Sequence, residues 1–282
     1  MSAAVTVHRP LAAQLELVAS AYDEIVLVLA PPRTASTALA RVFWGHDAIA
    51  FYAHEPFDRS FHEGAPLRSA ATALLEPLDL RRVLDAPDRG IGLLVKEMTF
   101  QAGNAAAALM ELATRPVVFL LRDPRLAIWS RMRMLGGGSE PVPFPPVETG
   151  WSALREQVRY CRLNRIDYVL LDASDMRRAP DAVLGALFDR LGFAYSPALL
   201  SWRAVDVDRL GGLGDAQRHW YRRLLESSSI APPVEPIPPL ERFPEEDGLR
   251  EHVEWALDAY EELRRDPCFL APSAHHARTE AA

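Results

Sequence analysis

The chain has 282 residues, of which 49% are hydrophobic and 24% are charged, and its formal net charge is −7. This balance is typical of a globular protein and excludes collagen-like, coiled-coil and wholly disordered chains. The longest apolar runs, such as Ile25–Ala30, are far shorter than the roughly 20 residues of a membrane span. The negative charge argues against nucleic acid and membrane surfaces as partners.

The cysteine and lysine contents are both low. Cys161 and Cys268 are too few for a disulfide framework or a structural zinc site. No long apolar stretch follows the N-terminus, so no signal peptide is predicted, and we expect a cytoplasmic protein. The basic residues are 30 arginines and one lysine, Lys96. A single lysine in so arginine-rich a chain is a candidate functional residue.

Segments of helical periodicity alternate with short apolar runs along the chain. The predicted helices are 5–22, about 34–44, 102–113, one that starts at 124, 151–164, 181–191 and 249–265. The predicted strands are 24–30, 48–53, 91–96, 116–121 and 168–171. This alternation favours one α/β domain of three layers, α/β/α, with a central parallel sheet.

Three segments are expected to form lid loops beside a binding site. They cover about residues 54–90, 136–150 and 205–217. The α/β domain is expected to span residues 1–271, and residues 272–282 are expected to be a disordered tail.

The turn after the first predicted strand has the features of an anion site. Its sequence is Pro31-Pro32-Arg33-Thr34-Ala35-Ser36-Thr37, and it leads directly into a helix. A helix N-terminus offers free backbone N–H groups and a favourable dipole, to which Arg33 adds a charge and Ser36 and Thr37 add hydroxyl donors. No lysine lies in the turn, which disfavours a magnesium-nucleotide loop. The alternative is an Arg33 surface ion pair with hydroxyls that cap the helix.

A second candidate anion site follows the fourth predicted strand. Arg122 ends that strand, Asp123 and Pro124 start a helix, and Ser130 lies two helical turns farther on. The planar guanidinium of Arg122 matches phosphate oxygens, and Ser130 is placed to share the same phosphate. The alternative is that Arg122 caps the sheet edge and Ser130 fills a groove between helices.

Together these motifs resemble the two cofactor motifs of sulfotransferases that use 3′-phosphoadenosine 5′-phosphosulfate (PAPS). The segment YVLLDASDMRRAPDAVLGALFDRLGF is similar to the strand, acidic turn and helix of that family, and DRLGGLGDAQRHW is similar to its loop over the nucleotide. The resemblance runs from about Ile25 to Leu225 and includes the Pro-Arg and Ser-Thr form of bacterial and carbohydrate-type members. It implies a P-loop-like fold.

The resemblance also implies the roles of the donor-binding residues. The first motif, with Arg33, Thr34, Ala35, Ser36 and Thr37, would embrace the 5′-phosphosulfate, while Arg122 and Ser130 would hold the 3′-phosphate. Gly211 and Gly212 of the loop would cover the nucleotide, and Arg209 just before them would reach the 3′-phosphate, with an exposed arginine as the alternative. The cofactor is PAPS, the product 3′,5′-adenosine bisphosphate, and no metal is required.

The sequence departs from the family at two places. Ala35 stands where a glycine is usual, and Lys96-Glu97-Met98 stands where a strand-end Lys-Thr-His is usual. The resemblance still assigns Lys96 to the bridging oxygen of the donor. The missing histidine requires another base, and Glu55 is the first candidate, ahead of Glu97 and His54. The alternative is a structural loop at 54–57.

Other polar residues are expected to be structural or solvated. Asp172 and Asp175 are expected to order the end of the sheet. The basic face of the helix after Pro124 is expected to be solvated, with an acidic acceptor as the alternative; it carries Arg125, Arg131 and Arg133. Aromatic side chains of the loops are expected around the acceptor: Phe51, Tyr52, Phe57, Phe61 and Phe144.

The sequence therefore predicts a sulfotransferase that moves a sulfuryl group to a hydroxyl, or less favourably an amine, of a small-molecule acceptor. One alternative is a small-molecule kinase on the same fold. Another is a nucleotide-binding or scaffold protein that has lost catalysis. The sequence is compatible with a homodimer and does not identify the acceptor.

Overall fold

A six-stranded sheet forms the centre of the computed structural model, which describes residues 9–137, 139–205, 227–233, 236–245 and 248–271. The strand order is β3-β2-β4-β1-β5-β6. All neighbours pair in parallel except β3, which is antiparallel to β2. The strands are β1 (Ile25–Ala30), β2 (Ile49–His54), β3 (Leu78–Asp79), β4 (Gly92–Met98), β5 (Val117–Leu121) and β6 (Tyr168–Asp172).

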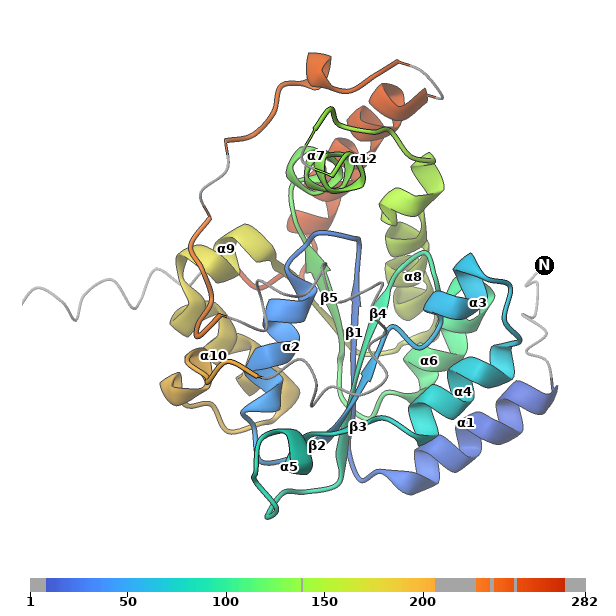
Figure 1. The fold of residues 1–282 in the computed structure, drawn as a ribbon, viewed down its shortest axis with the longest axis vertical. Coiled ribbons are helices and arrows are strands. Elements are labelled where there is room, and N and C mark those ends of the chain that lie inside the picture. Colours follow the sequence, from blue (N-terminus) through green and yellow to red (C-terminus); the bar gives the residue numbers. More distant parts are fainter. Residues whose placement is uncertain (1–8, 138, 206–226, 234–235, 246–247, 272–282) are drawn as a thin grey trace, which may run out of the picture.

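Helices cover both faces of this sheet (Figure 1). One face carries α2 (Ser36–Trp44), α5 (Leu80–Val83), α9 (Ala173–Arg178) and α10 (Pro180–Leu191). The other carries α1 (Arg9–Ala21), α3 (Asp58–His62), α4 (Leu67–Leu75), α6 (Ala106–Leu112) and α8 (Trp151–Asn164). Helices α7 (Pro124–Leu135) and α12 (Leu249–Arg264) lie together at the upper end in Figure 1.

Two hydrophobic clusters hold the layers together, one on each face of the sheet. Residues of β1 alternate between them: Ile25, Leu27 and Leu29 belong to one cluster, and Val26 and Val28 to the other. All six residues of β1 are buried, as expected for a central parallel strand covered by helices on both faces. Among the described residues, no helix combines the length and the apolar composition needed to cross a membrane.

The predicted α/β/α architecture with a central parallel sheet is confirmed. Each predicted strand is present within one or two residues, and the short antiparallel strand β3 is additional. The lid expected at about 54–90 is wrong for much of that segment, because it contains α3, α4, β3 and α5. Helix α4 buries Ala70, Ala71 and Leu74 in the core, so this part supports the sheet.

Candidate active site

The turn between β1 and α2 is shaped by two residues with left-handed backbone conformations. Arg33 has φ 63° and Ala35 has φ 62°. The Thr34 hydroxyl donates to the carbonyl of Pro31 at 2.9 Å, which closes the turn. Ala35 is the N-cap of α2 but has no side-chain acceptor to offer the first N–H groups. The helix therefore presents its N-terminus at the carboxyl edge of the sheet, where it favours an anion.

The two candidate anion sites of the sequence lie together in the structure. Nε of Arg33 donates to Oγ of Ser130 at 3.3 Å, and a terminal nitrogen of Arg122 donates to the carbonyl of Arg33 at 2.8 Å. Arg122 and Ser130 are both buried, at 7% exposure. Because β1 and β5 are neighbouring parallel strands, the turn after one meets the residues that follow the other. Two guanidinium groups, a hydroxyl and a helix N-terminus thus converge on one edge.

Lys96 of β4 and Glu55, the residue that follows β2, form a buried ion pair. Lys96 lies on β4 opposite His54 of β2, and the exposures of Lys96 and Glu55 are 1% and 6%. The ammonium of Lys96 pairs with Oε1 of Glu55, while the Glu55 N–H donates to the Lys96 carbonyl at 2.7 Å. Glu55 has φ 47°, an unusual conformation for glutamate that this backbone bond helps to hold. The first candidate base and the only lysine therefore contact each other directly.

Glu97 lies beside this pair and is fully buried. Its Oε2 accepts from the N–H of Phe57 at 2.8 Å, and its Oε1 accepts from the N–H of Met98 at 2.7 Å. Burial, followed by the charge of Glu55, raises the pKa of Glu97 to about 8. Glu97 therefore fastens the turn after Glu55 to the end of β4, and it is protonated at neutral pH.

His54 lies between Glu55 and a tyrosine. Nε2 of His54 is 3.4 Å from Oε1 of Glu55, and Nδ1 forms a hydrogen bond with the hydroxyl of Tyr52. Burial lowers the pKa of His54 to about 4, so its ring is neutral at physiological pH. Sequence reasoning placed Tyr52 among the acceptor aromatics and missed this contact. The available signal was spacing, since residues two apart on a strand point to the same face.

Gly150, at the C-terminal end of the 136–150 segment, packs against the turn between β1 and α2. Gly150 has φ 79°, and a Cβ there would lie 2.5 Å from the Thr99 hydroxyl and 3.2 Å from Cα of Pro31. The Thr99 hydroxyl donates to the Gly150 carbonyl at 2.8 Å, and the Gln157 amide donates to the Thr99 carbonyl at 2.7 Å. The start of α8 is therefore packed against the turn that begins the anion site.

Arg131 is not on a solvated face, contrary to the sequence prediction. Its side chain is 13% exposed, it pairs with Glu148, and its guanidinium lies 4.6 Å from the ring centre of Phe144 and 5.5 Å from that of Phe100. Burial lowers the pKa of Arg131. The residue therefore fixes the 136–150 segment to α7, because an ion pair and ring contacts replace the water it would otherwise meet.

The expected aromatic surroundings of the acceptor need a similar correction. Phe57 is 1% exposed and belongs to the core, and Tyr52 is 2% exposed and packs against Trp44. Phe61 is 37% exposed and contacts Phe100 edge to face, with ring centres 4.8 Å apart. Only part of the aromatic set therefore lies at the surface.

Some of the remaining candidates have structural roles, and others lie outside the residues that the structure describes. Asp172 caps α9 through the N–H groups of Ser174 and Asp175 and accepts from the Tyr260 hydroxyl at 2.8 Å, which fits the structural role expected for it. Ser36 is 5% exposed and begins α2, with Thr37 next to it. The predicted nucleotide loop, with Arg209, Gly211 and Gly212, lies outside the described residues, as does the 272–282 tail.

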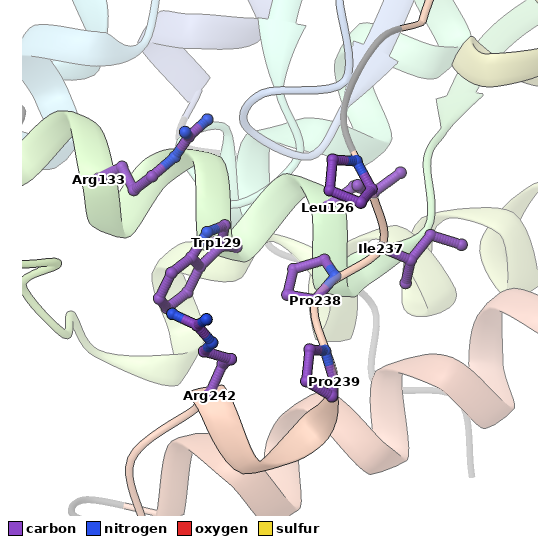
Figure 2. A pocket seen from close by; sticks show the side chains of 8 residues that line it. Leu126, Trp129, Arg133, Ile237, Pro238, Pro239 and Arg242 are labelled. Atoms are coloured by element: carbon purple, nitrogen blue, oxygen red, sulfur yellow. The ribbon is translucent and has the colours of Figure 1, made fainter.

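A groove of about 300 Å³ lies between α7 and the segment at 236–242 (Figure 2). Its lining is mostly apolar, with two arginines at the side: Leu126, Trp129, Arg133, Pro236, Ile237, Pro238, Pro239 and Arg242. The guanidinium of Arg242 lies 5.8 Å from the Trp129 ring centre. None of the predicted site residues lines this groove.

With this geometry in place, comparison with known proteins gives one family. A model described as a sulfotransferase domain matches residues 153–259. The predicted resemblance to sulfotransferases is confirmed. The matched segment contains Asp172 and the predicted nucleotide loop, and it begins after Arg33, Glu55, Lys96, Arg122 and Ser130. No curated protein matches the chain.

Three of the solved structures similar to this chain are described as sulfotransferases. The sulfotransferase domain of the Synechococcus PCC 7002 olefin synthase is 18% identical, with a TM-score of 0.47, and the match covers 87% of this chain and 96% of that one. The sulfotransferase domain from the curacin biosynthetic pathway is 20% identical, with a TM-score of 0.39 and coverages of 75% and 84%. Mouse sulfotransferase SULT7A1, solved with PAP, is 11% identical, with a TM-score of 0.37 and coverages of 87% and 93%.

Proposed function

We propose that this chain is a sulfotransferase that transfers a sulfuryl group from PAPS to a hydroxyl of a small-molecule acceptor, with an amine as the less favoured acceptor. The observation that carries the proposal is the convergence of Arg33, Arg122 and Ser130 at the N-terminus of α2, next to the buried pair of Lys96 and Glu55. The match to a sulfotransferase domain supports the same reaction class.

The residues at the α2 N-terminus fit a nucleotide with a phosphate at each end. Arg122 and Ser130 supply a planar guanidinium and a hydroxyl for the 3′-phosphate. Arg33 and the N–H groups at the start of α2 supply donors for the 5′-phosphosulfate. In the structure, Arg33 donates to the Ser130 hydroxyl and Arg122 donates to the Arg33 carbonyl. Arg33 and Arg122 thus bring two guanidinium groups to the edge of the sheet where the anionic groups of the donor would lie.

The residues at the ends of β2 and β4 fit the proton and charge movements of the transfer. PAPS supplies a sulfuryl group whose bond to the bridging oxygen breaks as its bond to the acceptor oxygen forms. Glu55 takes the proton that the acceptor hydroxyl loses, as a general base. The Lys96 ammonium donates toward the negative charge that develops on the departing phosphate oxygen. Glu97 is assigned to hold the turn rather than to act as the base, because both of its oxygens accept backbone N–H groups.

Thermal unfolding with four nucleotides tests the proposal. We expect 3′,5′-adenosine bisphosphate to stabilise the chain, and 5′-AMP, ADP and magnesium ATP to have much smaller effects. A ligand at about 100 times its dissociation constant adds about 2.7 kcal/mol to the free energy of unfolding. That corresponds to a rise of a few degrees in Tm for a chain of this size. A shift with magnesium ATP alone would indicate a kinase instead, and no shift with any nucleotide would favour a scaffold protein.

A further inference from the structure

The hydroxyl of Tyr52 contacts His54, whose ring lies beside Glu55. Tyr52 and His54 are two residues apart on β2, and their side chains share a face of the strand. The Tyr52 hydroxyl and Nδ1 of His54 form a hydrogen bond, and their rings are 5.5 Å apart. On its other side, the Tyr52 ring packs edge to face against Trp44 at 5.0 Å. Tyr52 is thus fixed by packing, and its hydroxyl has a defined partner.

The protonation states of the two rings limit how they can bond. Burial, followed by the charge of Glu55, raises the pKa of Tyr52, so the phenol keeps its proton. Burial lowers the pKa of His54 to about 4, against the attraction of Glu55 and with the repulsion of Lys96, so the imidazole carries a single N–H. The proton of that ring is therefore on either Nδ1 or Nε2.

The position of Glu55 distinguishes these two tautomers. An ionised carboxylate has only lone pairs to offer, and Oε1 of Glu55 lies 3.4 Å from Nε2 of His54. If the proton were on Nδ1, the lone pair of Nε2 would face the carboxylate oxygen. If the proton is on Nε2, the N–H lies on the side of the carboxylate, at 3.4 Å between nitrogen and oxygen, which is longer than an ordinary hydrogen bond, and Nδ1 accepts from the phenol. The second arrangement gives the phenol its acceptor and turns a positive N–H, not a lone pair, toward the carboxylate.

We propose that Tyr52 is a positioning residue, whose O–H donates to Nδ1 of His54, holds that ring as the neutral Nε2–H tautomer, and aims an N–H at Oε1 of Glu55. Oε1 then lies between two donors, the Lys96 ammonium and the His54 N–H. Two donors on one oxygen fix the rotation of the carboxylate. The tautomer follows from the positions of Tyr52 and Glu55 around a neutral, buried ring, whereas its use in orienting a base rests on the proposed function.

Nitrogen NMR of the chain with ¹⁵N-labelled histidine measures the tautomer directly, with or without catalysis. His54→Gln identifies the His54 signals by their loss. At pH 7 we expect Nε2 of His54 to carry the proton and Nδ1 to have the shift of an unprotonated nitrogen that accepts a hydrogen bond. In Tyr52→Phe, which keeps the ring against Trp44, we expect the Nδ1 shift to move and the Nδ1–H tautomer to become populated. Tyr160→Phe is the control, because the Tyr160 hydroxyl, at the surface of α8, donates to Glu111 of α6 rather than to His54.

Three outcomes would overturn the proposal. They are an Nδ1–H tautomer in the wild-type chain, a doubly protonated His54 at pH 7, and identical His54 signals in the wild type and Tyr52→Phe. The wild-type spectrum decides the first two even if Tyr52→Phe does not fold.

The catalytic consequence is tested separately by the release of 3′,5′-adenosine bisphosphate from PAPS, with a panel of simple alcohols and phenols. We expect Tyr52→Phe to lower kcat roughly tenfold to a hundredfold through misplacement of Glu55, and to leave KM for PAPS unchanged. Equal kcat in the two chains would contradict a positioning role. Absence of turnover and of bisphosphate binding in the wild type would count against the proposed function, while the tautomer result would stand.

Discussion

The two halves of the candidate site hold their charges in different ways. At the N-terminus of α2, Arg33 and Arg122 donate to a hydroxyl and a backbone carbonyl, which are neutral groups. At the ends of β2 and β4, the charge of Lys96 is met by the charge of Glu55 inside the protein. The first half thus gathers two guanidinium groups where the donor is proposed to bind, and the second half holds a buried ion pair. Substitutions in the first half should therefore affect ligand binding, and those in the second should affect both turnover and folding.

Removal of the Glu55 charge should have the largest effect. Glu55→Gln leaves the buried Lys96 ammonium without its counter-charge, which costs about 3–5 kcal/mol of folding stability. Loss of a general base lowers turnover by about 10²–10⁴-fold. Chemical denaturation and bisphosphate release from PAPS measure the two effects. Glu63→Gln is the matched control, because the pair of Arg59 and Glu63 is exposed and is worth at most about 1 kcal/mol. Equal effects of the two variants would remove the distinction between the halves.

Glu97 should make stability depend on pH in the second half. Its pKa is about 8 in the folded chain and 4.5 in the unfolded chain, so the folded state binds the proton more tightly. Its contribution to stability is therefore complete below about pH 4.5 and is lost as the pH rises to about 8. We expect the free energy of unfolding of the wild type, relative to Glu97→Gln, to fall by about 1.4 kcal/mol per pH unit across this window. A pH-independent difference would show that Glu97 is not buried as a protonated acid.

Ser130 should affect ligand binding with little effect on folding. Its hydroxyl is a neutral partner, so Ser130→Ala should weaken binding of 3′,5′-adenosine bisphosphate by about 0.5–1.5 kcal/mol, or roughly threefold to tenfold. Calorimetric titration measures this change. Ser152→Ala, at an exposed position on α8, should leave the affinity unchanged. A large loss of Tm in Ser130→Ala without a change in affinity would make Ser130 a packing residue.

Ala35 should give the smallest effect. A left-handed conformation costs a non-glycine residue roughly 1–2 kcal/mol, whereas glycine adds about 0.4–1 kcal/mol of unfolded-state entropy. Ala35→Gly should therefore stabilise the chain by about 1 kcal/mol or less. A substantial loss of stability would mean that the Cβ of Ala35 makes packing contacts that outweigh the strain. Bisphosphate affinity in this variant also tests whether the Cβ limits the approach of the nucleotide.

Much of the fold was predictable because it follows from local pattern. The buried strands are short apolar runs bounded by turn residues, and α7 begins at Asp123 and Pro124, which are an N-cap and a first-turn proline. Helix α4 was missed although Leu67, Ala70, Ala71 and Leu74 have helical spacing, because the segment around it is rich in proline and charge. Strand β3 has two residues and no local signal; its pairing with β2 creates it.

The first half of the site, at the N-terminus of α2, was more predictable than the second half, at the ends of β2 and β4. The spacing of Arg122 and Ser130 and the turn after β1 are local features, and neighbouring parallel strands bring them together. The pairing of Glu55 with Lys96 joins residues 41 positions apart, and it depends on burial that the sequence does not state. The burial of Arg131 is of the same kind, since its partners Phe144 and Glu148 come from a segment without regular periodicity.

The most direct test of the account is a calorimetric comparison of 3′,5′-adenosine bisphosphate and 5′-AMP, which differ only in the 3′-phosphate, in the wild type and in Arg122→Ala. We expect the wild type to prefer the bisphosphate by about 1.5–3 kcal/mol, or roughly tenfold to more than a hundredfold, and Arg122→Ala to lose most of this preference. Arg159→Ala, an exposed arginine paired with Glu156, should keep it. Equal affinities in the wild type, or an undiminished preference in Arg122→Ala, would contradict the assignment of this edge of the sheet to the 3′-phosphate.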